Sequence, residues 1–443
     1  MIKVKKLNKE YNLNICLIPN KLFKSLNLNL NTKYNINLGQ LSISTFIKPN
    51  KSTDENMYFS NKIFSNLHLL EDINLNIWRN NKDIYLGPVV GFFVDTRVLT
   101  AILAGKPYKE FREVSLSYFK VNTNTNCLLY YFSKDDINSN GLLINGYIYS
   151  NKEKKWKSYK LPIPNVIYNR CEEFNIHNYF KGNKNIKFIN PDIVLDKWHF
   201  YKKLFKYKDI EKYLIKTTLY KGFENIKKML NKCDSLFIKA YHGSRGKQVL
   251  YIKRNEEGFE VELYLKGLKR IQISDMKELE KIVGYFTGDG NFIVQERINL
   301  IKYKDRFIDI RVLIQKNISG NWYARTPFAR IGKGSFAITN YSAGGDGYSY
   351  TTIYPNLNKY YKNISIPTSK TLKDIAIKIA TYIDKEYGDF GEIGIDLAID
   401  ENGKIYFIEG NEFPAILPNK LKNKSLDKFS NILEYAIFLS KKR

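Results

Sequence analysis

The stretch KIYFIEGNEFP, from Lys404 to Pro414, begins as an apolar strand and then places Glu409 and Asn411 where more apolar residues would be expected. Strand side chains alternate between the two faces of a sheet, so this acid and this amide share a face, about 6 to 7 Å apart. We therefore expect them to act together.

A second strand candidate, GEIGIDLAID (Gly391 to Asp400), lies just upstream. Between the two strands stands Asn402-Gly403, a dipeptide favoured by two-residue hairpin turns. A loop of these two residues sets Asp396 directly opposite Glu409. Two facing carboxylates repel each other unless a cation lies between them.

The two acids and the amide form a candidate metal site. In the same register Asn411 faces Gly394, which brings the amide close to both carboxylates. Hard oxygen ligands suit Mg²⁺, which usually shares its shell with water and substrate phosphates. A nucleotide is therefore the expected partner. From the hairpin alone, the alternative is an ordinary turn whose polar ends are solvated.

The composition is that of a soluble protein with two or three domains. The chain has 443 residues, 44% hydrophobic and 14% aromatic, which excludes a largely disordered protein. No apolar run is long enough to span a membrane, and the start lacks the apolar segment of a signal peptide. The four isolated cysteines predict free thiols in a reducing compartment. We expect a cytoplasmic protein.

The formal net charge of +27 favours polyanionic partners such as nucleic acid, anionic surfaces or phosphate ligands. The lysines are spread along the whole chain, however, and no zinc-finger, RNP-type or basic-zipper pattern is present. Most of this charge is interpreted as solvated surface, and nucleic-acid binding stays a minority alternative.

The first eighty residues contain a repeat, because NKLFKSLNL (Asn20 to Leu28) recurs as NKIFSNLHL (Asn61 to Leu69) at an offset of 41. Each copy predicts a short helical turn followed by a strand. One copy alone cannot bury its apolar face, so two intertwined copies predict a small β-barrel of the double-psi kind. We assign residues 1–86 to this barrel.

Beyond the barrel the pattern changes to α/β. Residues 87–190 hold three apolar strand candidates, with a helix predicted in TRVLTAILAGKPYKEFREVS between the first two. Residues 191–443 hold further helices and strands together with most of the polar motifs. The expected fold is therefore a multidomain α+β or α/β protein.

A phosphate-binding element is predicted in FIKAYHGSRGKQV. Lys239 ends an apolar strand and is followed by a loop that contains Gly243, Ser244 and Gly246. Glycines let backbone N–H groups approach phosphate oxygens, and the lysine adds positive charge. The motif is not a Walker A sequence, and a short glycine-rich turn of purely structural role is the alternative. In FIVQERI, the backbone at the end of the strand could bind an adenine edge.

The order of these elements resembles the ATP-grasp superfamily over roughly residues 190–443. The likeness includes an Asp-Lys-Trp helix, a strand lysine with a glycine loop, a Gln-Glu strand end, an Asp-x-Arg strand, and an Asp followed by Glu-x-Asn. It is greatest for the YheC/YheD family of endospore-coat-associated ATP-grasp proteins, and extends through LGPVVGFF and PxPNVIYNR to the N-terminal segment. It implies a pre-ATP-grasp domain at residues 87–190 and an ATP-grasp domain at 191–443.

The resemblance also implies a role for individual residues. The implied ATP-binding residues are Lys197, Lys239, His242, Gly243, Ser244, Gly246, Gln295, Glu296, Arg297, Ile298 and Asp309. The two lysines would contact phosphates under the glycine loop, Glu296 to Ile298 would form the adenine hinge, and Asp309 would bind the ribose. The implied Mg²⁺ ligands are Asp396, Glu409 and Asn411, and the implied catalytic residues are Lys239, Arg330 and Asn340.

One position departs from the pattern. Many carboxylate ligases place an arginine two residues before the metal aspartate, where this chain has Gly394, and Arg330 is the candidate for that role. The implied activity is ATP-dependent ligation of a small-molecule or peptide carboxylate to an amine through an acyl-phosphate.

A second hypothesis is a spore coat protein that binds ATP without catalysis and assembles with other coat proteins. The family likeness and the net charge of +27 favour it, whereas the complete metal trio favours the ligase. A protein kinase is a poor third, since GKGSF (Gly332 to Phe336) is followed by neither His-Arg-Asp nor Asp-Phe-Gly.

Overall fold

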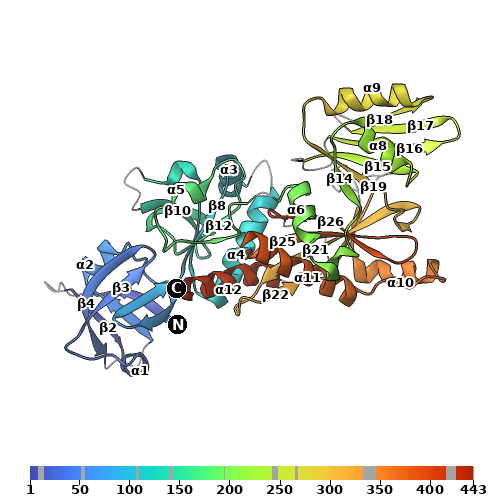
Figure 1. Cartoon of the computed structure of the whole chain (residues 1–443). Helices are drawn as coiled ribbons and strands as arrows, with labels where there is room; N and C mark the ends of the chain where they lie inside the picture. Colours follow the sequence, from blue (N-terminus) through green and yellow to red (C-terminus); the bar gives the residue numbers. More distant parts are fainter. Residues whose placement is uncertain are drawn as a thin grey trace. The chain divides into compact units, whose positions relative to one another are not determined.

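The computed structural model describes residues 1–7, 14–50, 55–105, 109–138, 143–193, 195–241, 248–264, 268–332, 346–415 and 426–442 (Figure 1). The chain forms two compact units. Unit 1 comprises Met1–Asp192, Lys316–Asn321 and Ala415–Arg443, and unit 2 comprises Ile193–Gln315 and Trp322–Pro414. Among the described residues, no helix has both the length and the apolar character needed to cross a membrane.

Unit 1 begins with a closed barrel of seven strands in the order β1-β5-β2-β4-β3-β7-β6. The elements are β1 (Ile2–Lys6), β2 (Ile15–Pro19), α1 (Asn20–Ser25), β3 (Lys33–Leu38), β4 (Leu41–Asn50), β5 (Asn56–Phe59), α2 (Asn61–Asn66), β6 (Asn74–Asn80) and β7 (Asp83–Gly87). The sequence repeat maps β2-α1-β3 onto β5-α2-β6, and the equivalent Leu28 and Leu69 are both buried. The predicted N-terminal barrel is therefore confirmed.

The rest of unit 1 is an α/β sheet in the order β11-β10-β9-β8-β12-β13. Its elements are β8 (Val89–Phe93), α3 (Thr96–Ala104), α4 (Lys109–Thr125), β9 (Leu128–Phe132), η1 (Lys134–Asp136), β10 (Leu143–Ser150), β11 (Lys155–Pro162), β12 (Val166–Asn169), α5 (Ile176–Tyr179) and β13 (Lys187–Ile189). The predicted helix is divided, since α3 ends at Ala104, Gly105 follows it with a left-handed φ of 72°, and α4 begins at Lys109.

The C-terminal helix α12 (Asp427–Lys441) returns to unit 1, where it packs against α4 and the β12–β13 edge of the sheet. Its buried residues include Phe429, Ile432 and Tyr435. The ring of Phe429 meets Tyr118 of α4 edge to face at a centroid distance of 4.8 Å. The buried residues lie around most of the helix, including the consecutive Asn431, Ile432 and Leu433, as expected for a helix in the core.

Unit 2 contains two antiparallel sheets. The first has the order β14-β19-β15-β16-β17-β18, and helices α8 and α9 share an apolar core with it. These elements are β14 (Thr217–Leu219), α8 (Phe223–Leu230), β15 (Ser235–Ala240), β16 (Val249–Asn255), β17 (Gly258–Tyr264), β18 (Leu268–Ile273), α9 (Met276–Thr287) and β19 (Phe292–Glu296).

The second sheet of unit 2 has the order β24-β23-β21-β25-β26, with β20 and β22 also paired to β21. Its strands are β20 (Lys302–Tyr303), β21 (Arg306–Lys316), β22 (Trp322–Ala324), β23 (Phe328–Ile331), β24 (Asp346–Ser349), β25 (Glu392–Ile399) and β26 (Ile405–Asn411). The helices of this part are α6 (Lys197–Leu204), α7 (Lys208–Glu211), α10 (Tyr350–Tyr360) and α11 (Ser369–Tyr387).

The hairpin of β25 and β26 has a longer loop than predicted. Asp400 N donates to Lys404 O at 3.0 Å, so the loop spans residues 401–403 instead of the two predicted residues. Gly403 adopts a φ of 79°, which a three-residue hairpin loop requires near its end. A register shift beside Asp396 inserts one extra residue in β26 and restores the predicted pairing beyond it.

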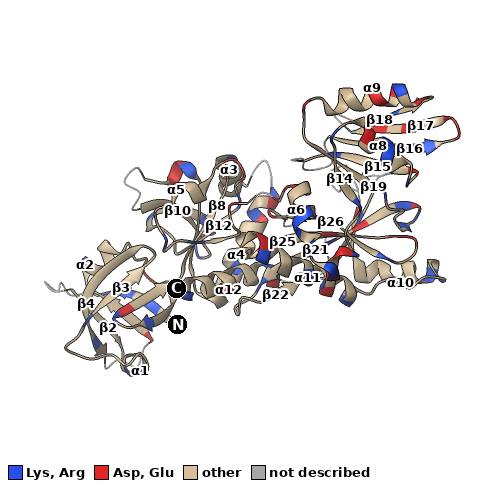
Figure 2. Ribbon diagram, viewed as in Figure 1, with Lys and Arg blue, Asp and Glu red and all other residues tan. Residues whose placement is uncertain are grey.

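Basic and acidic residues occur on most elements of both units (Figure 2), in agreement with the even spread of lysines along the chain. The charge of +27 is therefore not concentrated in one described element.

Candidate active site

The site begins with the two hairpin acids. Asp396 of β25 pairs with Glu409 of β26, and Gly394 pairs with Asn411, as the sequence predicts. Asp396 has no exposed surface, whereas Glu409 and Asn411 are half-buried. The Asn411 amide donates weakly to Asp396 Oδ2 at 3.4 Å. The three predicted metal ligands are thus brought together.

Two arginines from neighbouring strands bind the buried Asp396. Arg311 of β21 donates from Nε to Oδ1 and from Nη2 to Oδ2 at 2.8 Å, which makes a bidentate pair. Arg330 of β23 donates from Nη2 to Oδ2 at 2.8 Å. Burial alone would raise the pKa of Asp396, but these arginines outweigh it and hold the pKa below its ordinary value.

Arg330 also joins a second buried acid. Its Nε donates to Oδ1 of Asp309, the residue opposite it in the β21–β23 ladder. Burial opposes the charge of Arg330, but Asp396, Asp309 and Glu409 outweigh that effect and raise the pKa of the guanidinium. Asp309 is only 4% exposed and belongs to this arginine–carboxylate cluster. Its predicted role at the ribose stays a prediction.

The oxygen atoms of this site fit Mg²⁺ in their chemistry. Among the described residues, neither the Glu409 carboxylate nor Oδ1 of Asn411 has a hydrogen-bond partner. Asp396 Oδ1 accepts from Arg311 alone, so a further lone pair remains there. No group of three His, Cys, Asp or Glu residues suited to a metal occurs in the described part of the chain. The candidate metal ligands are instead two carboxylates and an amide, whose oxygen atoms are the kind that hard cations bind.

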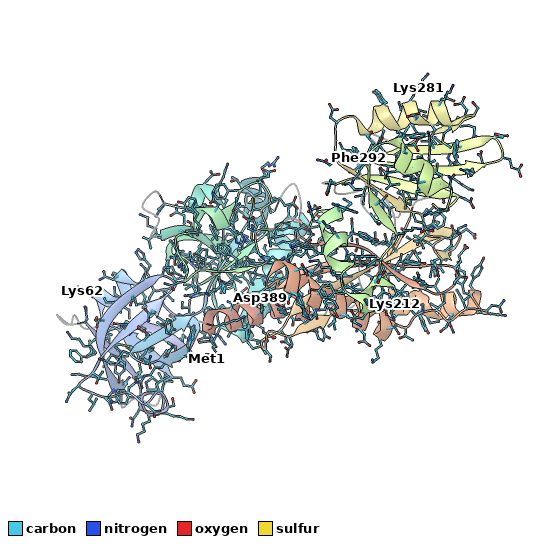
Figure 3. All side chains as sticks on the ribbon, in the orientation of Figure 1. Met1, Lys62, Lys212, Lys281, Phe292 and Asp389 are labelled. Carbon is cyan, nitrogen blue, oxygen red and sulfur yellow. The ribbon has the colours of Figure 1, made fainter. Side chains whose placement is uncertain are left out.

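Lys239 is the next-to-last residue of strand β15 and is anchored to the neighbouring strand β19, which begins at Phe292 (labelled in Figure 3). Its Nζ donates to Gln295 Oε1 at 2.7 Å, and the Gln295 amide donates to Thr217 Oγ1 at 2.9 Å. Burial lowers the pKa of Lys239 to about 8; the charge of Glu409 opposes this shift and that of Lys197 adds to it. Electrostatic interaction between Lys239 and Glu409 links the lysine to the metal candidates.

Lys197 stands at the first position of α6, directly after the cap residue. Asp196 caps the helix as predicted, since its Oδ1 accepts from His199 N at 2.9 Å. Lys197 is half-buried, and its positive charge helps to lower the pKa of Lys239. Two lysines that repel each other favour an anion between them.

The end of β19 leaves one backbone donor open among the predicted hinge residues. Glu296 N donates to Lys216 O at 3.0 Å, and Arg297 N donates to Ser235 O at 3.1 Å. Ile298 N has no acceptor among the described residues. Of the three predicted hinge residues, Ile298 is therefore the one whose backbone N–H is open to donate to a ligand. The Arg297 guanidinium lies 5.4 Å from the ring centroids of both Tyr251 and Phe307.

A model of the YheC/D-like ATP-grasp family matches residues 185–439, which is more than half of the chain. The chain belongs to this family. It is 24% identical over 408 residues to the endospore coat-associated protein YheD of Bacillus subtilis (strain 168), covering 88% of this chain and 87% of that protein. It is 21% identical over 293 residues to the endospore coat-associated protein YheC of the same strain, covering 64% of this chain and 80% of that protein.

Solved structures similar to this chain include a synthetase and a ligase. The D-alanyl-alanine synthetase A from Vibrio cholerae has a TM-score of 0.45 and 13% identity, covering 80% of this chain and 98% of that chain. The VanG D-Ala:D-Ser ligase from Enterococcus faecalis has a TM-score of 0.47 and 13% identity, covering 80% of this chain and 99% of that chain.

The ATP-grasp region contains further polar residues that the sequence analysis did not place in the site. Arg311 is the main one, and its signal was a charged residue on the same strand face as Asp309 within an otherwise apolar strand, FIDIRVLIQ. Thr217, which holds Gln295, gave no signal in the sequence because its contact is made across strands. Five predicted residues lie outside the described part of the chain: His242, Gly243, Ser244, Gly246 and Asn340.

Proposed function

We propose that this protein binds Mg²⁺-ATP and ligates a carboxylate substrate to an amine through an acyl-phosphate. The observation that carries the proposal is the opposed pair of Asp396 and Glu409, with Asn411 beside them. In the alternative, an ordinary hairpin with solvated polar ends, Asp396 would be exposed to water and would not need two arginines to stabilise its charge. Membership of an ATP-grasp family supports ATP as the nucleotide.

In this proposal each residue has a distinct task. Asp396, Glu409 and Asn411 would hold Mg²⁺, which supplies charge neutralisation at the phosphates. Lys239 and Lys197 bind phosphate oxygens, and the Ile298 amide binds the adenine edge. Gln295 keeps Lys239 in place by accepting from its Nζ. Arg330 faces the reacting phosphoryl group, beside the acid that it stabilises.

The chemistry proceeds in two displacements. A carboxylate oxygen of the substrate forms a bond to the γ-phosphorus, and the bond to the β–γ bridging oxygen breaks to release ADP. The amine nitrogen then forms a bond to the acyl carbon, inorganic phosphate leaves, and the nitrogen gives up a proton. Fixed positive charge at the phosphates favours the first step, and no protein nucleophile takes part.

An ATP-dependent phosphate-release screen over amino acids and small peptides tests this proposal. Hydroxylamine serves as a second amine, because it converts an acyl-phosphate to a stable hydroxamate. We expect release that requires both ATP and a carboxylate and that falls at least about 100-fold in Lys239→Met. Release that is equal with and without every carboxylate would contradict ligation.

A second candidate function is assembly in the spore coat with ATP as a bound ligand. Two curated relatives are named endospore coat-associated proteins, and the net charge of +27 suits adhesion to an anionic matrix. This candidate predicts Mg²⁺-ATP binding without phosphate release, together with retention of a fluorescently tagged protein on the coat of sporulating cells. The ligase proposal predicts turnover in the purified protein.

A further inference from the structure

Unit 2 has a pocket of about 500 Å³, a volume within the range of small-molecule sites. It is bounded by the loop end of the β25–β26 hairpin, the start of α11 and the segment between α7 and β14. None of the nucleotide or metal candidates lines it. Lys404 at its edge is about 15 Å along the strand from Glu409. The pocket is therefore separate from the candidate active site.

Hydrogen bonds fix two of the walls of this pocket. Phe407 N of β26 donates to Tyr213 O at 2.6 Å, which ties the segment after α7 to the hairpin. Thr368 caps α11, since its Oγ1 accepts from Thr371 N at 3.2 Å. The pocket is thus formed by paired backbone in the free protein, and a ligand does not have to order its walls.

The lining of the pocket is apolar at its base and polar at its rim. Three buried isoleucines form the base: Ile366, Ile375 and Ile405. Three exposed hydroxyl residues lie at the rim: Ser365, Thr368 and Thr371. This division suits a ligand with an apolar body and a polar end group.

Two exposed lysines, Lys212 (labelled in Figure 3) and Lys404, give the pocket its charge. Their Nζ atoms lie 5.1 Å and 4.6 Å from the ring centroids of Tyr213 and Tyr406, and neither has an acidic partner among the described residues. No Asp or Glu belongs to the described lining. The hairpin acid Asp400 accepts from Lys404 N at 2.8 Å. The charges at the pocket therefore favour an anion.

We propose that this pocket binds a small organic anion, a carboxylate or a phosphate monoester carried on an apolar body. Lys212 and Lys404 bind the anionic group, and the buried isoleucines contact the body. A free amino acid fits less well, because its ammonium group would lie near two lysines without an acid to pair with. The proposal goes beyond the proposed function and does not depend on it, since no residue of the pocket has a task there.

A ligand-observed NMR titration of the full chain tests this proposal, with 3-phenylpropionate and phenyl phosphate as probes. We expect a dissociation constant on the order of 1 mM for at least one of them, and the tighter probe identifies the anionic group. The neutral 3-phenylpropanol has the same apolar body and should bind at least about tenfold more weakly. Lys212→Gln and Lys404→Gln should each weaken probe binding about fivefold.

Two control variants separate this pocket from other positive charges. Lys228→Gln removes an exposed lysine of α8 outside the pocket, and Lys239→Met removes a phosphate-binding candidate. Both should bind the probes as wild type does, and thermal unfolding checks that every variant is folded.

Three results would overturn the proposal: no binding of either probe to folded wild type, equal binding of 3-phenylpropanol, or unchanged binding in both Lys212→Gln and Lys404→Gln. Loss of binding in Lys239→Met would also overturn it, because the probes would then occupy the nucleotide site. Failure of Mg²⁺-ATP to bind would contradict the proposed function and leave this pocket unaffected.

Discussion

Four charged side chains meet inside unit 2: Asp309, Arg311, Arg330 and Asp396. Two acids and two arginines balance in charge, and each acid accepts from at least one arginine. Taking such groups out of water costs several kcal/mol for each ion, and only well-directed pairing compensates it. A cluster of this kind is weak evidence for extra stability and is better explained by the need for charges at a fixed position.

Arg330→Leu should destabilise the protein by about 3–5 kcal/mol, because it removes the guanidinium that pairs with the buried carboxylates of Asp309 and Asp396. Urea unfolding followed by circular dichroism measures the change. Arg254→Leu is the control, since Arg254 is exposed and, among the described residues, its guanidinium contacts only the ring of Phe259. It should change stability by less than about 0.5 kcal/mol. Equal effects of the two substitutions would contradict the role of Arg330.

Lys239 should make nucleotide binding depend on pH. Its pKa in the free protein is lowered to about 8, and the protonated form binds phosphate. ATP affinity should therefore fall as the pH rises through about 8, by up to tenfold per pH unit. Lys239→Arg stays charged and should flatten this dependence in calorimetric titrations from pH 7 to 9.5. A profile in Lys239→Arg as steep as in wild type would assign the dependence to another group.

Lys239 also makes folding stability depend on pH, and this dependence has the opposite sign to that of ATP affinity. The unfolded lysine has the higher pKa, so the unfolded state binds more protons between about pH 8 and 10.4. The contribution of Lys239 to stability therefore rises with pH in this window. Lys239→Met removes the burial of a charge and should unfold at a higher urea concentration than wild type at pH 7.

At the level of elements, the hairpin of β25 and β26 shows how far sequence reasoning reaches. The pairing of Asp396 with Glu409 was correctly predicted, although from a loop that is one residue too short. The extra loop residue and the extra residue of the bulge compensate each other. Alternation and turn propensity cannot reveal a bulge, because it depends on how β26 meets its neighbours.

Gly403 should be a sensitive position in this hairpin. Its φ is 79°, and an added Cβ would lie 2.6 Å from Ser365 O, a backbone atom that cannot move easily. Gly403→Ala should cost about 1–3 kcal/mol in urea unfolding. The control Gly284→Ala lies in helix α9 with open space around it and should be neutral or stabilising by up to about 1 kcal/mol. A neutral Gly403→Ala would show that the loop conformation is not as described.

At the level of the whole molecule, the sequence repeat predicted the barrel because equivalent apolar residues occupy equivalent positions in the two copies. The destination of helix α12 could not be predicted in the same way. Its apolar residues indicate that Phe429 and Ile432 are buried, but not that they pack in unit 1 with α4. The roles of Arg311 and Thr217 were missed for a similar reason, since both depend on contacts between strands distant in sequence.

Removal of α12 should therefore unfold unit 1. Burial of Phe429, Ile432, Leu433 and Tyr435 contributes about 1.5–3 kcal/mol per side chain, a sum comparable to the stability of a domain. In calorimetry, a chain that ends at residue 426 should lose the thermal transition of unit 1 and keep that of unit 2. A chain that ends at Ser440 should behave like wild type. Retention of both transitions after removal of the helix would contradict its role in the core.

The most direct test of the central claim is calorimetric binding of Mg²⁺-ATP to wild type and to Glu409→Gln. This substitution removes the charge of a half-buried acid that has no described hydrogen-bond partner, and nearly preserves its shape. We predict Mg²⁺-dependent binding by wild type that weakens at least about 100-fold in the variant, with unchanged thermal unfolding of the free protein. Equal binding by the two proteins, or no binding by a folded wild type, would contradict a metal–nucleotide site at Asp396, Glu409 and Asn411.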